Sequence, residues 1–239
     1  MQSKSPYKRI LLKLSGEALM GDQNYGITGD SCHAIALGIK DFVDNNIQVG
    51  VVVGGGNIFR GISGGDKLGI SRTPADHMGM LATIINAIAL QQALESVGVQ
   101  AICMSAIACQ PIADPYNHKQ AIHHLEKNRV VIFAGGTGSP YFTTDTAAAL
   151  RACEIQAEIL LKATKVNGVY TQDPLKHPDA KRFETLTYAE VLAQKLNVMD
   201  ATSVALCMSC QIPILVFNMW TTQKLTDVLV NKNLGTLVH

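Results

Sequence analysis

The sequence predicts an α/β fold built on a mainly parallel central sheet. Short apolar runs rich in β-branched residues alternate along the 239 residues with segments of helical periodicity, which is the pattern of successive strand–helix–strand units. Residues 49–53 are apolar throughout, as expected for a strand buried on both faces of a parallel sheet. The sequence has no internal repeat, low-complexity tract or linker, so we expect residues 1–239 to form a single domain.

The N-terminal half carries three of the expected helices. Ile35, Ile39 and Phe42 share one helical face, and Asp30 or Ser31 can cap that helix. Apolar residues also keep a helical period between residues 77 and 96, after a glycine-rich loop, and Asp76 can cap this second helix. The elements expected up to residue 134 are strand 8–14, the helix capped by Asp30 or Ser31, strand 49–53, loop 61–75, helix 77–96, strand 99–104, helix 117–127 and strand 130–134.

The C-terminal half continues the alternation. Asn167-Gly168 is typical of a tight turn, and Thr187 with Glu190 forms the pattern of a capping box. The elements expected here are a helix from Asp145 to about residue 156, strand 159–163, a long loop with two Xaa-Pro pairs, a helix from Thr187 to about 195, a helix over 201–210 preceded by Asp200, strand 212–217 and a helix from Thr222.

Composition excludes several classes of protein. Lys and Arg number 20 and Asp and Glu 19, and this balance argues against a general nucleic-acid binder, which carries a basic excess. Because no run of about 18 apolar residues occurs and Lys13 interrupts the apolar run that precedes it, we expect neither a membrane span nor a signal peptide. The six cysteines lie mostly in apolar stretches, so we expect reduced thiols and a cytoplasmic protein.

Glycine-containing turns follow three of the predicted strands, at Ser15-Gly16, 54–56 and 135–138. Parallel strands present their carboxyl ends at one edge of the sheet, where ligands bind, and glycine lets backbone N–H groups approach an anion. This arrangement predicts a phosphate site. The G-x-x-x-x-G-K-[ST] and G-x-G-x-x-G fingerprints are both absent.

Charged residues occur at the same predicted edge. Lys13 and Lys162 are flanked by apolar strand residues, so they are less well explained as surface charges without a function. Arg60 follows the triple glycine. Positioned cations offset the repulsion between two phosphate groups. Asp76, Asp145 and Asp200 are interleaved with these cations, and each can serve as a helix cap, as a ligand-binding group or as both.

Two further patterns favour structural explanations. Cys207-x-x-Cys210 lacks the second ligand pair of a zinc site and lies at the far end of its predicted helix, away from the end that stabilises a thiolate. His118, His123 and His124 fall on a polar helix face, as surface residues do.

Several segments together resemble the amino-acid kinase family, and more narrowly the bacterial uridylate kinases, over nearly the whole chain. They are residues 7–19, 53–61, 76–83, 142–145, 162–170, 198–200 and 216–219, and the first of them contains Lys13-Leu14-Ser15-Gly16. The resemblance implies a three-layer αβα sandwich with an acceptor-binding N-terminal lobe over about 1–155 and an ATP-binding lobe over about 156–239. It also implies transfer of the γ-phosphoryl group of ATP to UMP in pyrimidine nucleotide synthesis, with Mg²⁺ accompanying ATP, a homohexamer, and feedback inhibition by UTP.

The resemblance also assigns roles by motif. For ATP it implies Lys13, Leu14, Ser15, Gly16, Gly56, Arg60, Thr164, Asn167, Tyr170 and Asp173. For UMP it implies Gly55, Asp76, Thr137, Gly138, Ser139, Pro140, Tyr141, Phe142, Thr143 and Thr144. Lys13, Arg60 and Lys162 would act on the transferring group, and Asp145 and Asp200 would organise the lysines. No protein ligands to a metal are implied.

The sequence departs from the family pattern at two places and leaves three alternatives open. Gln91, Gln92 and Glu95 stand where some relatives carry basic residues, which questions activation by GTP, and Asn167 stands where many have Asp. The alternatives are a related kinase with another acceptor, a nucleotide-binding regulator without turnover, and a thiol-redox protein that uses Cys207 and Cys210.

Overall fold

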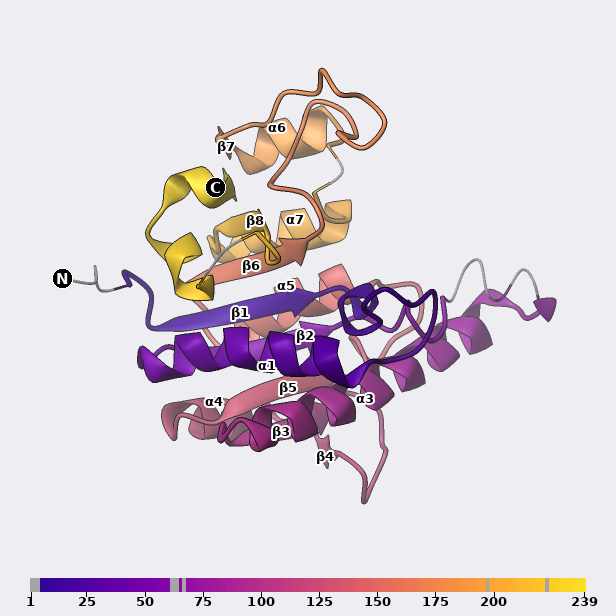
Figure 1. Ribbon diagram of the computed structural model, residues 1–239. Helices are drawn as coiled ribbons and strands as arrows, with labels where there is room; N and C mark the ends of the chain where they lie inside the picture. The colour runs from indigo at the N-terminus through magenta and orange to yellow at the C-terminus, as the bar shows by residue number, and fades with distance from the viewer. Residues whose placement is uncertain (1–4, 61–64, 66–67, 197, 222–223) are drawn as a thin grey trace.

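The central sheet runs through the whole molecule (Figure 1). The structure is a computed structural model that describes residues 5–60, 65, 68–196, 198–221 and 224–239. Within these residues nine strands form one sheet in the order β4-β3-β5-β2-β1-β6-β8-β9-β7. The strands are β1 (Arg9–Leu14), β2 (Gln48–Val53), β3 (Ala101–Ser105), β4 (Asp114–Pro115), β5 (Val130–Ala134), β6 (Ile159–Thr164), β7 (Thr185–Leu186), β8 (Ile214–Asn218) and β9 (Gly235–Val238).

The strand pairings are parallel except for β8 with β9, which confirms the mainly parallel sheet. The helices of the described residues are α1 (Gly29–Asp44), α3 (Arg72–Ser96), α4 (His118–Glu126), α5 (Thr144–Glu154), α6 (Tyr188–Ala193) and α7 (Ala201–Cys210), together with the 3₁₀ turns η1 (Gly16–Leu19), η2 (Leu225–Leu229) and η3 (Lys232–Leu234). Among them we find no helix long and apolar enough to cross a membrane.

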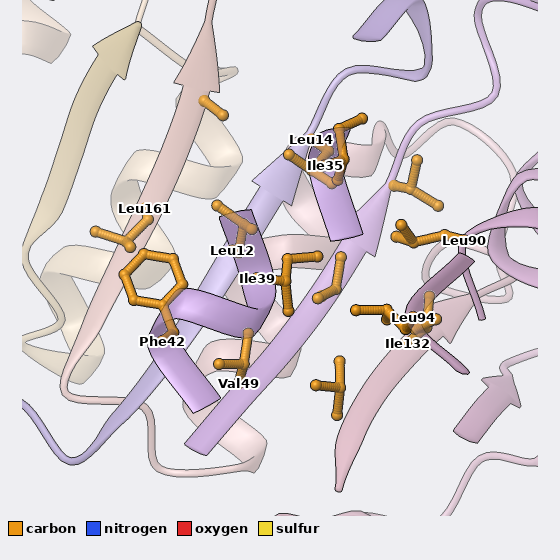
Figure 2. Packing of buried hydrophobic residues seen from close by; sticks show 14 of the residues in the cluster. Leu12, Leu14, Ile35, Ile39, Phe42, Val49, Leu90, Leu94, Ile132 and Leu161 are labelled. Atoms are coloured by element: carbon orange, nitrogen blue, oxygen red, sulfur yellow. The ribbon is translucent and has the colours of Figure 1, made fainter. Parts of the chain in front are cut away.

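The core is divided into two layers by the alternation of side chains along the strands. In β1, Leu12 and Leu14 point into the cluster that holds α1 and α3, whereas Leu11 points into the cluster that holds α4, α5 and α7. Figure 2 shows the first cluster, where Ile39 and Phe42 of α1 lie over the strands. Helices thus cover both faces of the sheet, and the expected three-layer sandwich is confirmed. The boundary between lobes near residue 155 stays a prediction.

Two helices begin earlier than predicted. The side chain of Thr28, not of Asp30 or Ser31, caps α1 by accepting from Ser31 N. Ser71 is the N-cap of α3, so the helix starts at Arg72 and Asp76 lies inside it. Pro74 is tolerated there because the first turn of a helix leaves its N–H groups without intrahelical partners. Gly61 and Gly64 of the predicted loop lie outside the described residues.

The C-terminal segment differs most from prediction. Thr222 lies outside the described residues. The next element is the short turn η2, after which β9 returns antiparallel to β8. Leu225, Val228 and Leu229 are buried. Their spacing fits a helix, but only one short turn of it forms. The helix predicted here is therefore wrong, and β4, β7 and β9 were not predicted.

Cys153 of α5 and Cys210 at the end of α7 form a disulfide, with Cα atoms 6.1 Å apart. The expectation that all six thiols are reduced is wrong for these two, because the packing of α5 on α7 brings together residues that are 57 positions apart. Cys207 is free and buried, and burial raises its pKa to about 12. The C-x-x-C pair is therefore not bonded to itself, which removes the basis for the thiol-redox alternative.

Reduction of this disulfide is expected to destabilise the fold. A cross-link that closes a loop of this length stabilises by up to about 4 kcal/mol through the unfolded state. Dithiothreitol should lower the midpoint of thermal unfolding of the natural chain and of Cys109→Ser, whose thiol is unbonded, but not that of Cys210→Ser. An equal midpoint for the natural chain with and without reductant would contradict the cross-link.

Candidate functional site

Three charged side chains meet at the carboxyl edge of the two central strands. Lys13 of β1 and Lys162 of β6 are direct partners in the parallel register. Asp145, in the first turn of α5, lies between their ammonium groups. Its Oδ1 is 2.7 Å from Lys13 Nζ, and its Oδ2 is 2.7 Å from Lys162 Nζ. The side chains of Lys13, Asp145 and Lys162 are only 11%, 15% and 16% exposed. We call these three residues the lysine–aspartate cluster.

The cluster carries a net positive charge in a shielded place. Burial opposes ionisation of Asp145, but the two ammonium groups outweigh it and hold the pKa of this carboxyl below its ordinary value. Burial lowers the pKa of Lys162, against the attraction of Asp145, and Lys13 adds to the lowering. The Lys162 ammonium also donates to the carbonyl of Val198 at 2.5 Å. Two cations therefore share one anion, and a charge of about +1 remains for a ligand.

The two carboxylate oxygens of Asp200 bind different helices. Oδ1 accepts from the backbone N–H of Ser203 at 2.9 Å, which confirms the predicted cap of α7. Oδ2 accepts from the hydroxyls of Thr143 and Thr146 at 2.5 and 3.0 Å. Thr143 is the N-cap of α5, so Asp200 joins the N-terminal ends of α5 and α7. Its hydrogen bonds go to Ser203 and the two threonines, and its negative charge favours the ammonium form of Lys162.

A pocket of about 770 Å³ lies beside the cluster on the side of α1. It is lined by Lys13 and Lys162, by Ser15 and Thr164 at the ends of their strands, and by further residues that include Glu17, Asp22, Asp30, Lys165 and Trp220. Of the residues assigned to ATP, Lys13, Ser15 and Thr164 line this pocket. Asn167, Tyr170 and Asp173 follow β6 but are not part of its lining, Leu14 is buried in the core, and Gly16 is buried beside Gly54.

A second pocket, of about 230 Å³, lies between α3 and the turn after β5. Six residues assigned to UMP line it, namely Gly55, Asp76, Thr137, Phe142, Thr143 and Thr144, together with Gly56, Arg60 and Arg72. Gly138, Ser139, Pro140 and Tyr141 belong to the same turn without lining the pocket, although Tyr141 N donates to Asp76 Oδ2 at 2.8 Å. At Gly55 a Cβ would stand 2.8 Å from the carbonyl of Gly79, so only glycine lets the β2 loop approach α3 so closely.

Arg60 connects the two pockets rather than joining the cluster. It lines the smaller pocket and forms an ion pair with Glu17, which lines the larger one. Glu17 also accepts from Lys165 at 3.0 Å. The hydrogen bond from Lys165 is the largest influence on Glu17 and lowers its pKa. The structure thus brings Lys13 and Lys162 together as expected and places Arg60 on the rim between the pockets.

Sequence reasoning missed several residues of these pockets, among them Glu17, Arg72, Lys165 and Trp220. Glu17 and Arg72 carried a local signal. Glu17 directly follows Gly16 of the first glycine turn, and Arg72 stands one helical turn before Asp76. His118 and His123 are exposed and His124 is half-buried, and among the described residues no group of three or more His, Cys, Asp and Glu side chains could hold a metal ion.

Comparison with known proteins identifies the family of this chain. The model of the amino acid kinase family matches residues 8–218. A uridylate kinase of Protochlamydia amoebophila (strain UWE25) is 56% identical over 233 residues, which cover 97% of this chain and 92% of that protein.

Two solved structures are also similar. A UMP kinase from Bacillus anthracis gives a TM-score of 0.93 at 37% identity, covering 98% of this chain and 96% of its own. A UMP kinase from Ureaplasma parvum gives a TM-score of 0.91 at 40% identity, and the match covers 97% of this chain and 98% of that one. The chain therefore belongs to the amino acid kinase family, and its similarity within that family is to the uridylate kinases.

Proposed function

We propose that this enzyme transfers the γ-phosphoryl group of ATP to UMP, giving UDP and ADP. The observation that carries the proposal is the pair of pockets on either side of one positive cluster. Lys13 and Lys162 line the larger pocket, and Thr144, the neighbour of Asp145, lines the smaller one. ATP is assigned to the larger pocket and UMP to the smaller one. The names and similarity of the relatives support this choice of substrates.

The chemistry needs positioning and charge more than proton transfer. An oxygen of the UMP phosphate is already anionic, so it attacks the γ-phosphorus without a general base, while the bond to the leaving ADP oxygen breaks. Lys13 and Lys162 stabilise the charge that spreads over the transferring group, and Asp145 keeps both ammonium groups in place. When substrate binds, the guanidinium of Arg60 exchanges its ion pair with Glu17 for a contact with a substrate phosphate. Since the cluster is shielded from water, these charges act more strongly than they would in solvent.

Mg²⁺ accompanies ATP in this proposal. In such sites the ion is held mainly by nucleotide phosphates and water rather than by a protein cage. Glu17, Asp22 and Asp30 are the carboxylates of the larger pocket that could add a ligand. The ion supplies charge neutralisation to the polyphosphate.

We further propose a cytoplasmic homohexamer inhibited by UTP at the acceptor pocket. Leu81, Ile85 and Ile88 are 49%, 50% and 39% exposed, and their spacing places them on one face of α3, as in a helix that packs on a second copy. Sedimentation of the chain, with and without UTP, tests the assembly.

UMP is expected to be the preferred acceptor. In a coupled assay of ADP release with UMP, CMP, dTMP and acetylglutamate, UMP should exceed each of the others in kcat/KM. The anion-binding and hydroxyl-binding groups of the smaller pocket favour a nucleotide with an intact ribose over dTMP and acetylglutamate, and the similarity to uridylate kinases is the reason to expect UMP over CMP. UDP formation separates an enzyme from a regulator that only binds nucleotides. A preference for any other acceptor would overturn the substrate assignment.

A further inference from the structure

Arg72 occupies the first position of α3, where a cation is electrostatically unfavourable. The N-terminal end of a helix carries partial positive charge, which favours acidic residues there, and the first turn of α3 contains none. A basic residue in this place gains nothing from the helix dipole, and its partner on the helix is Asp76, one turn further along. Such departures concentrate at functional sites.

The guanidinium of Arg72 makes two contacts at once. Its Nε donates to Asp76 Oδ2 at 2.6 Å, and its Cζ lies 5.3 Å from the centre of the Tyr141 ring, within the range of a cation–π contact. Asp76 is only 11% exposed, and Arg72 is 35% exposed. Both Arg72 and Asp76 line the smaller pocket.

The backbone of Tyr141 is held in an unusual conformation, which is a separate observation on the same contact. Its φ of +72° lies in the left-handed region, which is an outlier for a bulky residue, costs about 1–3 kcal/mol and persists only where surrounding contacts enforce it. Two contacts hold Tyr141 in this conformation, since its N–H donates to Asp76 Oδ2 and its ring lies against Arg72. Asp76 Oδ2 is thus the point where the turn after β5 is tied to α3.

We propose that Arg72 is a positioning residue that sets the specificity for the ribose of the acceptor. Arg72 and Tyr141 N both engage Oδ2 of Asp76, so the carboxylate is fixed in rotation and presents Oδ1 for a ribose hydroxyl. The proposal rests on the proposed acceptor, since it names how the same pocket recognises the sugar.

The test measures how strongly the enzyme distinguishes UMP from analogues that lack a ribose hydroxyl. With saturating ATP, kcat/KM is measured for UMP, 2′-deoxy-UMP and 3′-deoxy-UMP. The natural chain should favour UMP by about 100-fold over the analogue that lacks the hydroxyl bound by Asp76, since a hydrogen bond to a charged group contributes a factor of this order. In Arg72→Gln that preference should fall at least about tenfold, because kcat/KM drops for UMP and hardly changes for the analogue. The loss should appear mainly in KM for UMP.

Two variants complete the design. Lys40→Gln removes a cation from another i, i+4 pair, Lys40 with Asp44 on α1, and should keep the natural preference. Arg72→Lys keeps the charge but lacks the planar guanidinium that donates and stacks together, so it should resemble Arg72→Gln. Equal losses on UMP and both analogues in Arg72→Gln, or the natural preference in Arg72→Lys, would overturn the positioning role. Absence of UMP turnover in the natural chain would instead overturn the proposed function.

Discussion

The Asp145→Asn variant should lose about 3–5 kcal/mol of unfolding free energy and at least about 10³-fold of turnover. Asn keeps the size of the side chain but removes the anion that Lys13 and Lys162 share at 2.7 Å each. Two ammonium groups on paired strands then face each other in a shielded place, and removing one partner of buried charges costs about that much. The lysines also lose the placement on which charge stabilisation depends.

Urea unfolding at neutral pH and the coupled assay measure the two losses. Asp44→Asn, which removes the exposed partner of Lys40, is the matched control. It should change the free energy of unfolding and the turnover only slightly. The stability gap between natural chain and Asp145→Asn should narrow as the pH rises, because Lys162, whose pKa burial already lowers, sheds its proton and removes the repulsion. A variant as stable as the natural chain at neutral pH would contradict the proposed charge balance.

Lys13→Ala should lose turnover to a similar extent but only a little stability. Removal of Lys13 leaves Asp145 paired with Lys162, so the cluster becomes neutral and no buried charge is orphaned. The free energy of unfolding should fall by less than about 2 kcal/mol, since part of the side chain's packing is also lost. Turnover should fall by about 10³-fold, since one of the two cations at the transferring group is gone.

Measured side by side, the two variants separate structural from chemical contributions of the cluster. Equal stability losses in Lys13→Ala and Asp145→Asn would show that Lys162 alone cannot neutralise Asp145. Near-normal turnover in Lys13→Ala would overturn the role of Lys13 in phosphoryl transfer.

The centre of the sheet was predictable because its signals are local. Strand β5 falls on the residues predicted, and β1, β2 and β6 within one residue or two, since each is a continuous apolar run that ends in glycine or a charged residue. Lys13 and Lys162 were marked by their apolar neighbours. Their direct register, by contrast, depends on the pairing of β1 with β6, which neither segment specifies alone.

Features that depend on packing were missed. The spacing of Leu225, Val228 and Leu229 fits a helix equally well, and only the return of β9 along β8 decides against it. The Cys153–Cys210 bond joins two helices through tertiary contact. The role of Asp76 was predicted as a cap or a ligand, but its ties to Arg72 and Tyr141 need the turn after β5 in place.

The register of Lys13 opposite Lys162 also links activity to the order in which the chain folds. These residues lie far apart in sequence, so their pairing closes a long loop, and such non-local contacts form slowly. A ribosome-bound chain that ends before β6 has two of the three cluster residues, Lys13 and Asp145, and no second cation. Recovery of turnover during refolding is therefore a direct signal of β1–β6 closure, and it should trail the formation of α1 and α3, which depend on nearer contacts.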